Sequence, residues 1–332
     1  MKVLSDLFSL FIATTLAADV RTVYEFPKPT WLENIDTMRN GSLLVTSIGV
    51  AEVHMITPSP HKNATSSLVA SFPNANAVLG ITELTENVFA VAAGNMTPTN
   101  SPITGSFAIW SIDLTCKDSS AAKVHKIADI PKVDMVNGLE ALNPHTLLLA
   151  DSWAGNIVKL DTKTGATEVT LSHPTLLANF SVSALPLGVN GLKVHDGYVY
   201  YSNTVQHLLG RVRINPSSAR AIGPFTTLAT GAANNISVPD DFAVAKDGSV
   251  YLCGPLATPD GDTLQHVGLD GKVVTVAQGG VVAGTTAARF GKARGDKGVV
   301  YLSTMGGFAA DGSRLAGGRV VSVTLDGAGK EL

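Results

Sequence analysis

A unit of two short apolar strands joined by a tight turn recurs along the whole chain, and this recurrence limits the folds open to it. The clearest copy is LPLGVNGLKVHDGYVYYSNT, residues 185–204, in which Asp196-Gly197 separates two apolar runs, a strong hairpin signal. Six such units open, 46 to 58 residues apart, at Glu33, Leu79, Asn137, Asn190, Asp240 and Thr286. A period of this order with several strands per unit is typical of a β-propeller.

Each unit also carries a second pair of strand-like runs. We therefore predict an all-β fold, a six-bladed β-propeller with four antiparallel strands per blade. The last unit lacks an outer strand, and residues 20–26 are expected to supply it, which would close the ring and remove an open sheet edge. One closed array of this kind uses residues 19–332 as a single domain.

The first 18 residues have the features of a secretory signal peptide. One charged residue, Lys2, precedes a short apolar stretch that ends at the small pair Ala17-Ala18. The alternative is a buried N-terminal strand or helix. Five Asn-X-Ser/Thr sequons agree with a secretory or secreted location, although such triplets also arise by chance. These candidate glycosylation sites are Asn40, Asn63, Asn95, Asn179 and Asn235.

Composition narrows the possible partners. The net charge is −3, acidic and basic residues are interspersed, and no basic stripe with interleaved aromatic residues occurs, so a nucleic-acid partner is not expected. Nothing after the first 18 residues is expected to cross a membrane. Cys116 and Cys253 fall in different parts of the predicted ring, too far apart for a disulfide, and both are expected to be free thiols.

In a propeller the first strand of every blade lines the central channel, so the residues that open these strands meet at one channel mouth. Two carboxylates and two amides occupy four of the six opening positions. The alternative is that each caps its strand locally, but buried polar groups cost about 1–3 kcal/mol each when unpaired, which favours a shared site. The candidate catalytic residues are Glu33, Asn137, Asn190 and Asp240.

The remaining opening positions and the loops after each second strand form a rim around the same mouth. Aromatic and apolar residues there would make the mouth partly apolar, although packing between blades is the alternative for each of them. The candidate substrate-binding residues are Trp31, Leu79, Asp151, Trp153, Asn203, Thr286 and Met305.

This pattern resembles the SMP-30/gluconolactonase-like propellers across essentially the whole mature chain. That resemblance implies a divalent metal held by a glutamate, an asparagine and an aspartate, which match Glu33, Asn190 and Asp240, with Asn137 as a further asparagine. The oxygen ligands would suit Ca²⁺ or Mg²⁺, and the implied activity is a metal-dependent lactonase. The sequence departs from the family's pattern at three places. Glu33-Asn34 stands where the family has Glu-Gly, and Pro239-Asp240-Asp241 stands where it has Pro-Asp-Gly. The family's arginine near the second blade has no obvious counterpart.

A narrower resemblance fits these departures. The segments TWLENI, residues 30–35, and NGSLLVT, residues 40–46, are similar to a secreted fungal branch that includes hetero-Diels–Alderases of tropolone–sesquiterpenoid biosynthesis. What this implies is a cofactor-free cycloaddition of small molecules. A hydroxymethyl tropolone would lose water to a quinone-methide-like diene, which would then add to a humulene-type alkene.

One protonated carboxyl could assist departure of the hydroxyl group if burial raises its pKa, and Glu33 and Asp240 are both candidates for that acid. The metal-dependent lactonase remains the alternative. A non-catalytic propeller that binds a protein partner through its loops is a third possibility, which an exposed apolar patch on one rim would favour.

Overall fold

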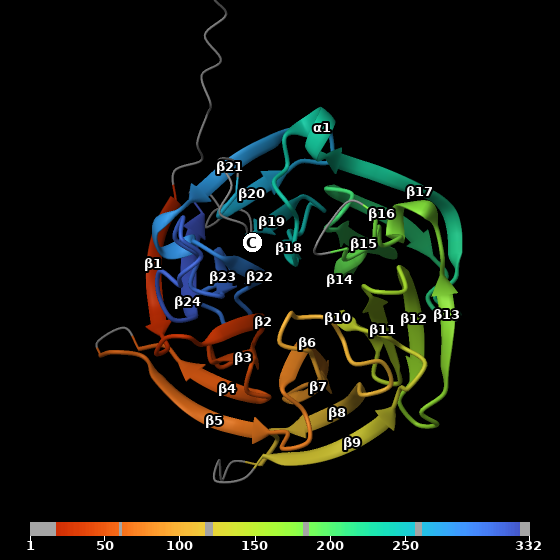
Figure 1. The fold of residues 1–332 in the computed structure, drawn as a ribbon, viewed down its shortest axis with the longest axis horizontal. Coiled ribbons are helices and arrows are strands. Elements are labelled where there is room, and N and C mark those ends of the chain that lie inside the picture. Colours follow the sequence, from red (N-terminus) through yellow and green to blue (C-terminus); the bar gives the residue numbers. More distant parts are fainter. Residues whose placement is uncertain (1–17, 60–61, 117–121, 182–185, 256–260, 326–332) are drawn as a thin grey trace, which may run out of the picture.

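The computed structural model describes residues 18–59, 62–116, 122–181, 186–255 and 261–325. Over these residues the chain is an all-β propeller whose sheets stand around a common axis (Figure 1). The first strand of each repeat lies nearest the axis. These inner strands are β2 (Trp31–Thr37), β6 (Ala77–Thr85), β10 (Val136–Asn143), β14 (Val189–His195), β18 (Phe242–Val244) and β22 (Thr285–Phe290).

Four separate sheets have four strands each. Three of them follow chain order outward from the inner strand: β10 to β11 (Thr146–Asp151), β12 (Asn156–Asp161) and β13 (Thr167–Leu171); β14 to β15 (Tyr198–Asn203), β16 (Leu208–Ile214) and β17 (Ala221–Thr230); and β18 to β19 (Val250–Gly254), β20 (Thr263–Val267) and β21 (Val273–Gln278). The fourth comprises β22, β23 (Val299–Thr304), β24 (Arg319–Leu325) and β1 (Ala18–Glu25).

The first two repeats share one eight-stranded sheet, so the predicted six separate sheets are not all separate. Besides β2 and β6 it holds β3 (Leu43–Ile48), β4 (Glu52–Thr57), β5 (Thr65–Ser71), β7 (Val88–Gly94), β8 (Ala108–Asp113) and β9 (Lys123–Asp129). A single residue pair, Ile48 with Ala77, connects β3 to β6 and merges the two groups. In the part of the chain that the structure describes there are also three short helices: η1 (Pro174–Leu176), α1 (Gly231–Asn234) and η2 (Gly280–Val282).

The N-terminal strand β1 pairs antiparallel with β24, as the outer strand of the sheet that also holds the last repeat. This is the position expected for residues 20–26. The predicted signal peptide falls on residues 1–17, which lie outside the described residues, and on Ala18. Ala18 opens β1 and pairs with Leu325, so the strand begins one residue before the predicted domain boundary.

Each of five inner strands contains a β-bulge near its start, at the opening residue. In β14, for example, Val189 pairs with Asn203 and Leu192 pairs with Tyr201. The two pairs are three residues apart on β14 but only two apart on β15, so β14 has one extra residue there. The same shift occurs in β2, β6 and β10, and a shorter one occurs in β22. A bulge adds one residue to the strand, so side chains three apart, rather than two, point to the same side.

The glycines that follow two opening asparagines are required by close packing between inner strands. A Cβ added at Gly138 would lie 2.4 Å from the carbonyl oxygen of Asn190, and one at Gly191 would lie 2.6 Å from Asp241 Oδ1. The Asn-Gly pairs are therefore bulge positions at which neighbouring sheets touch, and only glycine leaves room for that contact.

Apolar side chains fill the space between neighbouring sheets. One cluster joins Leu148 of β11, Leu192 of β14 and Tyr201 of β15, all fully buried or nearly so. Both cysteines are free thiols, as predicted, with Cys116 exposed and Cys253 buried. No helix among the described residues is long and apolar enough to span a membrane.

The sequons differ in exposure. Three have an exposed asparagine, and the other two are partly buried; their glycosylation remains a prediction. The exposed ones are Asn40, Asn63 and Asn235, and the partly buried ones are Asn95 and Asn179.

Candidate functional site

The four candidate catalytic residues lie at or next to the starts of inner strands, at one end of the axis, which we call the mouth. Glu33 is on β2, Asn137 on β10 and Asn190 on β14, and all three are buried. Asp240 lies two residues before β18 and is half-buried. Because Asn34 Nδ2 donates a 3.2 Å hydrogen bond to Asp241 Oδ2, the chain positions next to Glu33 and Asp240 are held directly together.

Glu33 is anchored by the indole beside it. Trp31 Nε1 donates a 2.8 Å hydrogen bond to Glu33 Oε2. Burial raises the pKa of Glu33 to about 7; the Trp31 hydrogen bond opposes this shift and the negative charge of Asp241 adds to it. Near neutral pH this carboxyl is therefore poised between its two protonation states.

Asp240 is the second carboxyl at the mouth. Burial raises its pKa well above the ordinary value, the negative charges of Glu33 and Asp241 raise it further, and a hydrogen bond from the Asn190 side chain opposes the shift. Two carboxyls this close do not ionise together without cost, so Glu33 and Asp240 titrate as a pair. The Trp31 hydrogen bond favours the anion on Glu33, and the charge of that anion favours a proton on Asp240.

The side chain of Asn190 has one hydrogen-bond acceptor that no donor satisfies. Its Nδ2 donates to Thr204 Oγ1 at 2.9 Å, and Thr204 Oγ1 in turn donates to the carbonyl of Pro239 at 2.9 Å. Its Oδ1 is buried and has no hydrogen-bond partner among the described residues. An unpaired buried acceptor costs about 1–3 kcal/mol, so a ligand that brings a donor or a cation to Asn190 Oδ1 would be favoured.

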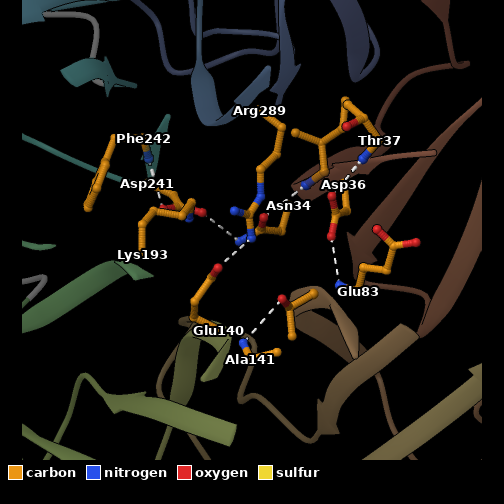
Figure 2. A network of polar contacts seen from close by, with 12 residues as sticks. Asn34, Asp36, Thr37, Glu83, Glu140, Ala141, Lys193, Asp241, Phe242 and Arg289 are labelled. Atoms are coloured by element: carbon orange, nitrogen blue, oxygen red, sulfur yellow. Dashed lines mark hydrogen bonds and ion pairs between the residues drawn. The ribbon is translucent and has the colours of Figure 1, made fainter. Parts of the chain in front are cut away.

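Further along the inner strands lies a set of charged residues that the sequence analysis did not single out. We call Asp36, Glu83, Glu140, Lys193, Asp241, Arg289 and Lys292 the inner charge cluster; Figure 2 shows most of it, with residues from several inner strands converging on the axis.

Part of this cluster connects β2, β6 and the end of β22. Lys292 Nζ donates to Asp36 Oδ1 and to Glu83 Oε2, both at 2.9 Å. Burial alone would raise the pKa of Asp36, but the charges of Arg289 and Lys292 hold it below the ordinary value. Asp36 is therefore an ionised, paired carboxylate.

The rest of the cluster crosses the axis. Arg289 Nη2 donates to Glu140 Oε2 at 2.8 Å, and Lys193 Nζ donates to Asp241 Oδ1. Lys193 and Asp241 are both almost fully buried. Burial and the charge of Arg289 lower the pKa of Lys193, while Asp241 and Glu140 oppose that shift. These pairs hold the inner strands together beneath the mouth.

A signal for this cluster was present in the sequence. In four repeats a charged residue stands three positions after the opening residue: Asp36, Glu140, Lys193 and Arg289. Without a bulge these residues would face away from the opening side chain. The bulges return them to the same side, so the period of two expected for a strand hides the pattern.

Two polar rim residues predicted to contact substrate form hydrogen bonds with backbone groups of the protein. Asp151 is buried and accepts hydrogen bonds from three backbone N–H groups of neighbouring segments. Asn203 is fully buried and donates to two backbone carbonyls at the η1 segment. Both side chains therefore fix loops at the rim.

The other predicted rim residues differ from one another in their contacts. Leu79 is fully buried in the core, and Thr286 Oγ1 donates to the carbonyl of Leu32. Trp153 packs edge-on against Phe180, with ring centroids 5.1 Å apart, and the side chain of Met305 is buried. Among the predicted substrate contacts, Trp31 has a direct link to the carboxyl pair, through its hydrogen bond to Glu33.

The raised pKa of Glu33 predicts how stability depends on pH. The folded chain keeps a proton up to about pH 7, whereas the ordinary value is 4.5. Since the folded state binds more protons between these values, the free energy of unfolding falls as pH rises from 5 to 8. Glu33→Gln should remove up to about 3 kcal/mol of this fall, measured by urea unfolding across that range. The exposed Glu86→Gln is the control, and equal slopes in the two variants would contradict the assignment.

The mouth offers only a partial metal site. Within the described ranges, no three or more His, Cys, Asp or Glu side chains are grouped so that they could hold a metal ion. A hard cation would have the Glu33 and Asp240 carboxylates and the unpartnered Asn190 Oδ1. This all-oxygen set fits Ca²⁺ or Mg²⁺ by ligand type.

Two fungal proteins named as hetero-Diels–Alderases are similar to this chain in sequence. One, from Sarocladium schorii, is 24% identical over 320 residues, which covers 85% of this chain and 77% of the relative. The other, from a Phoma species, is 23% identical over 314 residues and covers 87% of both chains. No family model matches the sequence.

Solved structures confirm the fold. A luciferin-regenerating enzyme superposes with a TM-score of 0.66 at 16% identity, covering 94% of this chain and 96% of that one. A calcium-binding regucalcin of Agrobacterium tumefaciens strain C58 superposes with a TM-score of 0.64 at 13% identity, covering 95% and 96%. The expected resemblance, to SMP-30-type propellers and to the fungal hetero-Diels–Alderases, is therefore confirmed.

Proposed function

We propose that this protein is a hetero-Diels–Alderase that joins a tropolone-derived quinone methide to a humulene-type alkene at the mouth. The observation that carries the proposal is the buried carboxyl pair, Glu33 and Asp240, whose pKa values are both raised, beside the unpartnered acceptor of Asn190. Similarity over most of the chain to two proteins named for this class of reaction supports it.

The residues at the mouth suit formation of the diene by loss of water. Asp240, which holds the shared proton, donates it to the hydroxymethyl oxygen, while Asn190 Oδ1 accepts the hydrogen of that hydroxyl. The C–O bond breaks, the ring O–H electrons form a C=O bond, and the ring double bond shifts to the exocyclic carbon. Glu33 takes the ring O–H proton, so water leaves and the pair still holds one proton.

The following cycloaddition needs no further group from the protein. Holding diene and alkene together supplies about 7–11 kcal/mol of the barrier. The partly buried ring of Trp31, whose N–H binds Glu33, would contact the terpene and help keep water from the quinone methide.

We further propose that the eight-stranded sheet acts as two blades, which gives a closed six-bladed ring. The single Ile48–Ala77 pair between its halves and the β1–β24 pairing support this count. The leader-like residues 1–18 and the exposed sequons support passage through the secretory route, which the N-terminal sequence of the protein from its native host would test.

A metal-dependent lactonase is the second candidate, favoured by the unpartnered Asn190 Oδ1. In that function Glu33, Asn190 and Asp240 would hold Ca²⁺ or Mg²⁺, which when bound would polarise a lactone carbonyl. The chain's own part would be to hold the lactone beside the ion.

One experiment separates the two functions. The chain is treated with a chelator and given either a hydroxymethyl tropolone with a humulene-type alkene, or a panel of sugar lactones, before and after Ca²⁺ is restored. We expect a dihydropyran product at the same rate in both states. Lactone hydrolysis that disappears on chelation, with no coupling, would decide for the second candidate.

A further inference from the structure

A hairpin at the mouth ends in a stack that reaches Glu33. The segment between β23 and β24 folds back on itself through a bridge between Phe308 and Arg314. The Arg314 guanidinium lies 4.4 Å from the ring centroid of Phe308 and 4.8 Å from that of Trp31, and it donates to the carbonyl of Met305. Arg314 is therefore held against two aromatic rings.

The stack continues to the carboxyl pair through one side chain. Trp31 contacts Arg314 with its ring and donates its indole N–H to Glu33 Oε2 at 2.8 Å. That bond fixes Oε2 and leaves Oε1 as the oxygen of Glu33 that Trp31 does not bind. Since Trp31 is only partly buried, its orientation depends on what packs against it.

We propose that Arg314 is a positioning residue for the reaction: by fixing the indole of Trp31, it holds the Glu33 carboxylate in the orientation that receives the ring O–H proton. The inference rests on the proposed function for the role of Glu33. Arg314 itself does not touch the reacting atoms. Its planar guanidinium suits stacking on a ring, whereas the ammonium group of a lysine would keep the charge and lose the plane.

A second arginine stack in the same chain provides a matched control. Arg211 lies 4.7 Å from the ring centroid of Tyr198 and 5.6 Å from that of Tyr200, and it donates to the Tyr200 hydroxyl. Tyr198 pairs with His195 at the far end of β14, whereas Asn190 is at the mouth end of that strand. Arg211→Ala therefore removes a similar stack away from the mouth.

The test compares Arg314→Ala, Arg314→Lys and Arg211→Ala with the unaltered chain on two diene precursors. One is the hydroxymethyl tropolone, which needs the carboxyl pair, and the other carries a better leaving group and forms the diene without it. We expect Arg314→Ala to lower kcat about tenfold on the first precursor, with KM and the rate on the second changed less than about twofold. On the first precursor, the kcat of Arg314→Lys should lie between that of Arg314→Ala and that of the unaltered chain. The kcat of Arg211→Ala should equal that of the unaltered chain.

Fluorescence gives a readout that does not depend on activity. With Trp110→Phe and Trp153→Phe as background, Trp31 is the remaining tryptophan, and its anisotropy should fall in Arg314→Ala but not in Arg211→Ala. The inference is overturned by an unchanged kcat, by equal losses on both precursors, or by a loss of kcat without a change in Trp31 anisotropy. If the unaltered chain couples neither precursor, the proposed function fails, and the role of Arg314 in that reaction fails with it.

Discussion

Asp240→Asn is expected to lower the rate of coupling from the hydroxymethyl precursor by about 10²- to 10⁴-fold, the range for loss of a general acid. The amide keeps the size of the side chain and can still contact Asn190, but it has no proton to give to the leaving hydroxyl. Because burial and the charge of Glu33 both raise the pKa of Asp240 in the unaltered chain, the loss should be present across neutral pH. Steady-state product formation, followed by chromatography, measures it.

The precursor with the better leaving group separates chemistry from binding. Asp240→Asn should couple it at close to the unaltered rate, since the diene then forms without an acid. Asp129→Asn, at an exposed carboxyl paired with Lys126, is the control and should behave as the unaltered chain with both precursors. If Asp240→Asn and the unaltered chain form product from the hydroxymethyl precursor at equal rates, Asp240 is not the general acid.

Lys193→Met is expected to lower the free energy of unfolding by about 3–5 kcal/mol, the usual cost of leaving one member of a buried ion pair without its partner. Lys193 and Asp241 have side-chain exposures of 5% and 3%. Without the ammonium group, the Asp241 carboxylate keeps its hydrogen bonds from Asn34 and Phe242 but faces no positive charge at its closest contact. Urea unfolding monitored by circular dichroism measures the change.

The double variant Lys193→Met/Asp241→Asn should recover much of that loss, because no unpaired charge is then buried. Arg39→Met, which breaks an exposed pair with Glu86, is the control and should cost less than about 1 kcal/mol. Losses that add in the double variant would show that Lys193 and Asp241 do not stabilise the fold as a pair.

The repeat was readable from the sequence because it rests on local signals. Turn residues such as Asp196-Gly197 and the apolar strands around them recur at a regular period, and the structure places the inner strands where those signals predicted. The merging of the first two repeats was not readable. It depends on one backbone pair, Ile48 with Ala77, to which side-chain pattern contributes nothing.

At the candidate site, the sequence located the mouth but not its electrostatics. Glu33, Asn137 and Asn190 lie near the starts of inner strands and Asp240 lies two residues before β18, but which polar atoms are already paired depends on contacts between distant segments. Asp151 and Asn203 were predicted to contact substrate from the rim, and backbone groups use hydrogen bonds of both side chains.

Most of the inner charge cluster was missed for a similar reason. Asp36, Lys193 and Arg289 read as ordinary strand residues until the bulges are known, because the bulges alone bring residues three apart to one side.

The most direct test of the account is the stereochemistry of the coupling product. A quinone methide released into solution adds to the alkene from either face or is captured by water, whereas one formed and kept at the mouth meets the alkene in a single orientation. Chiral chromatography of the dihydropyran made by the chelator-treated chain is therefore predicted to give a single enantiomer. A racemic product, or a water adduct in its place, would contradict a cycloaddition held at the mouth.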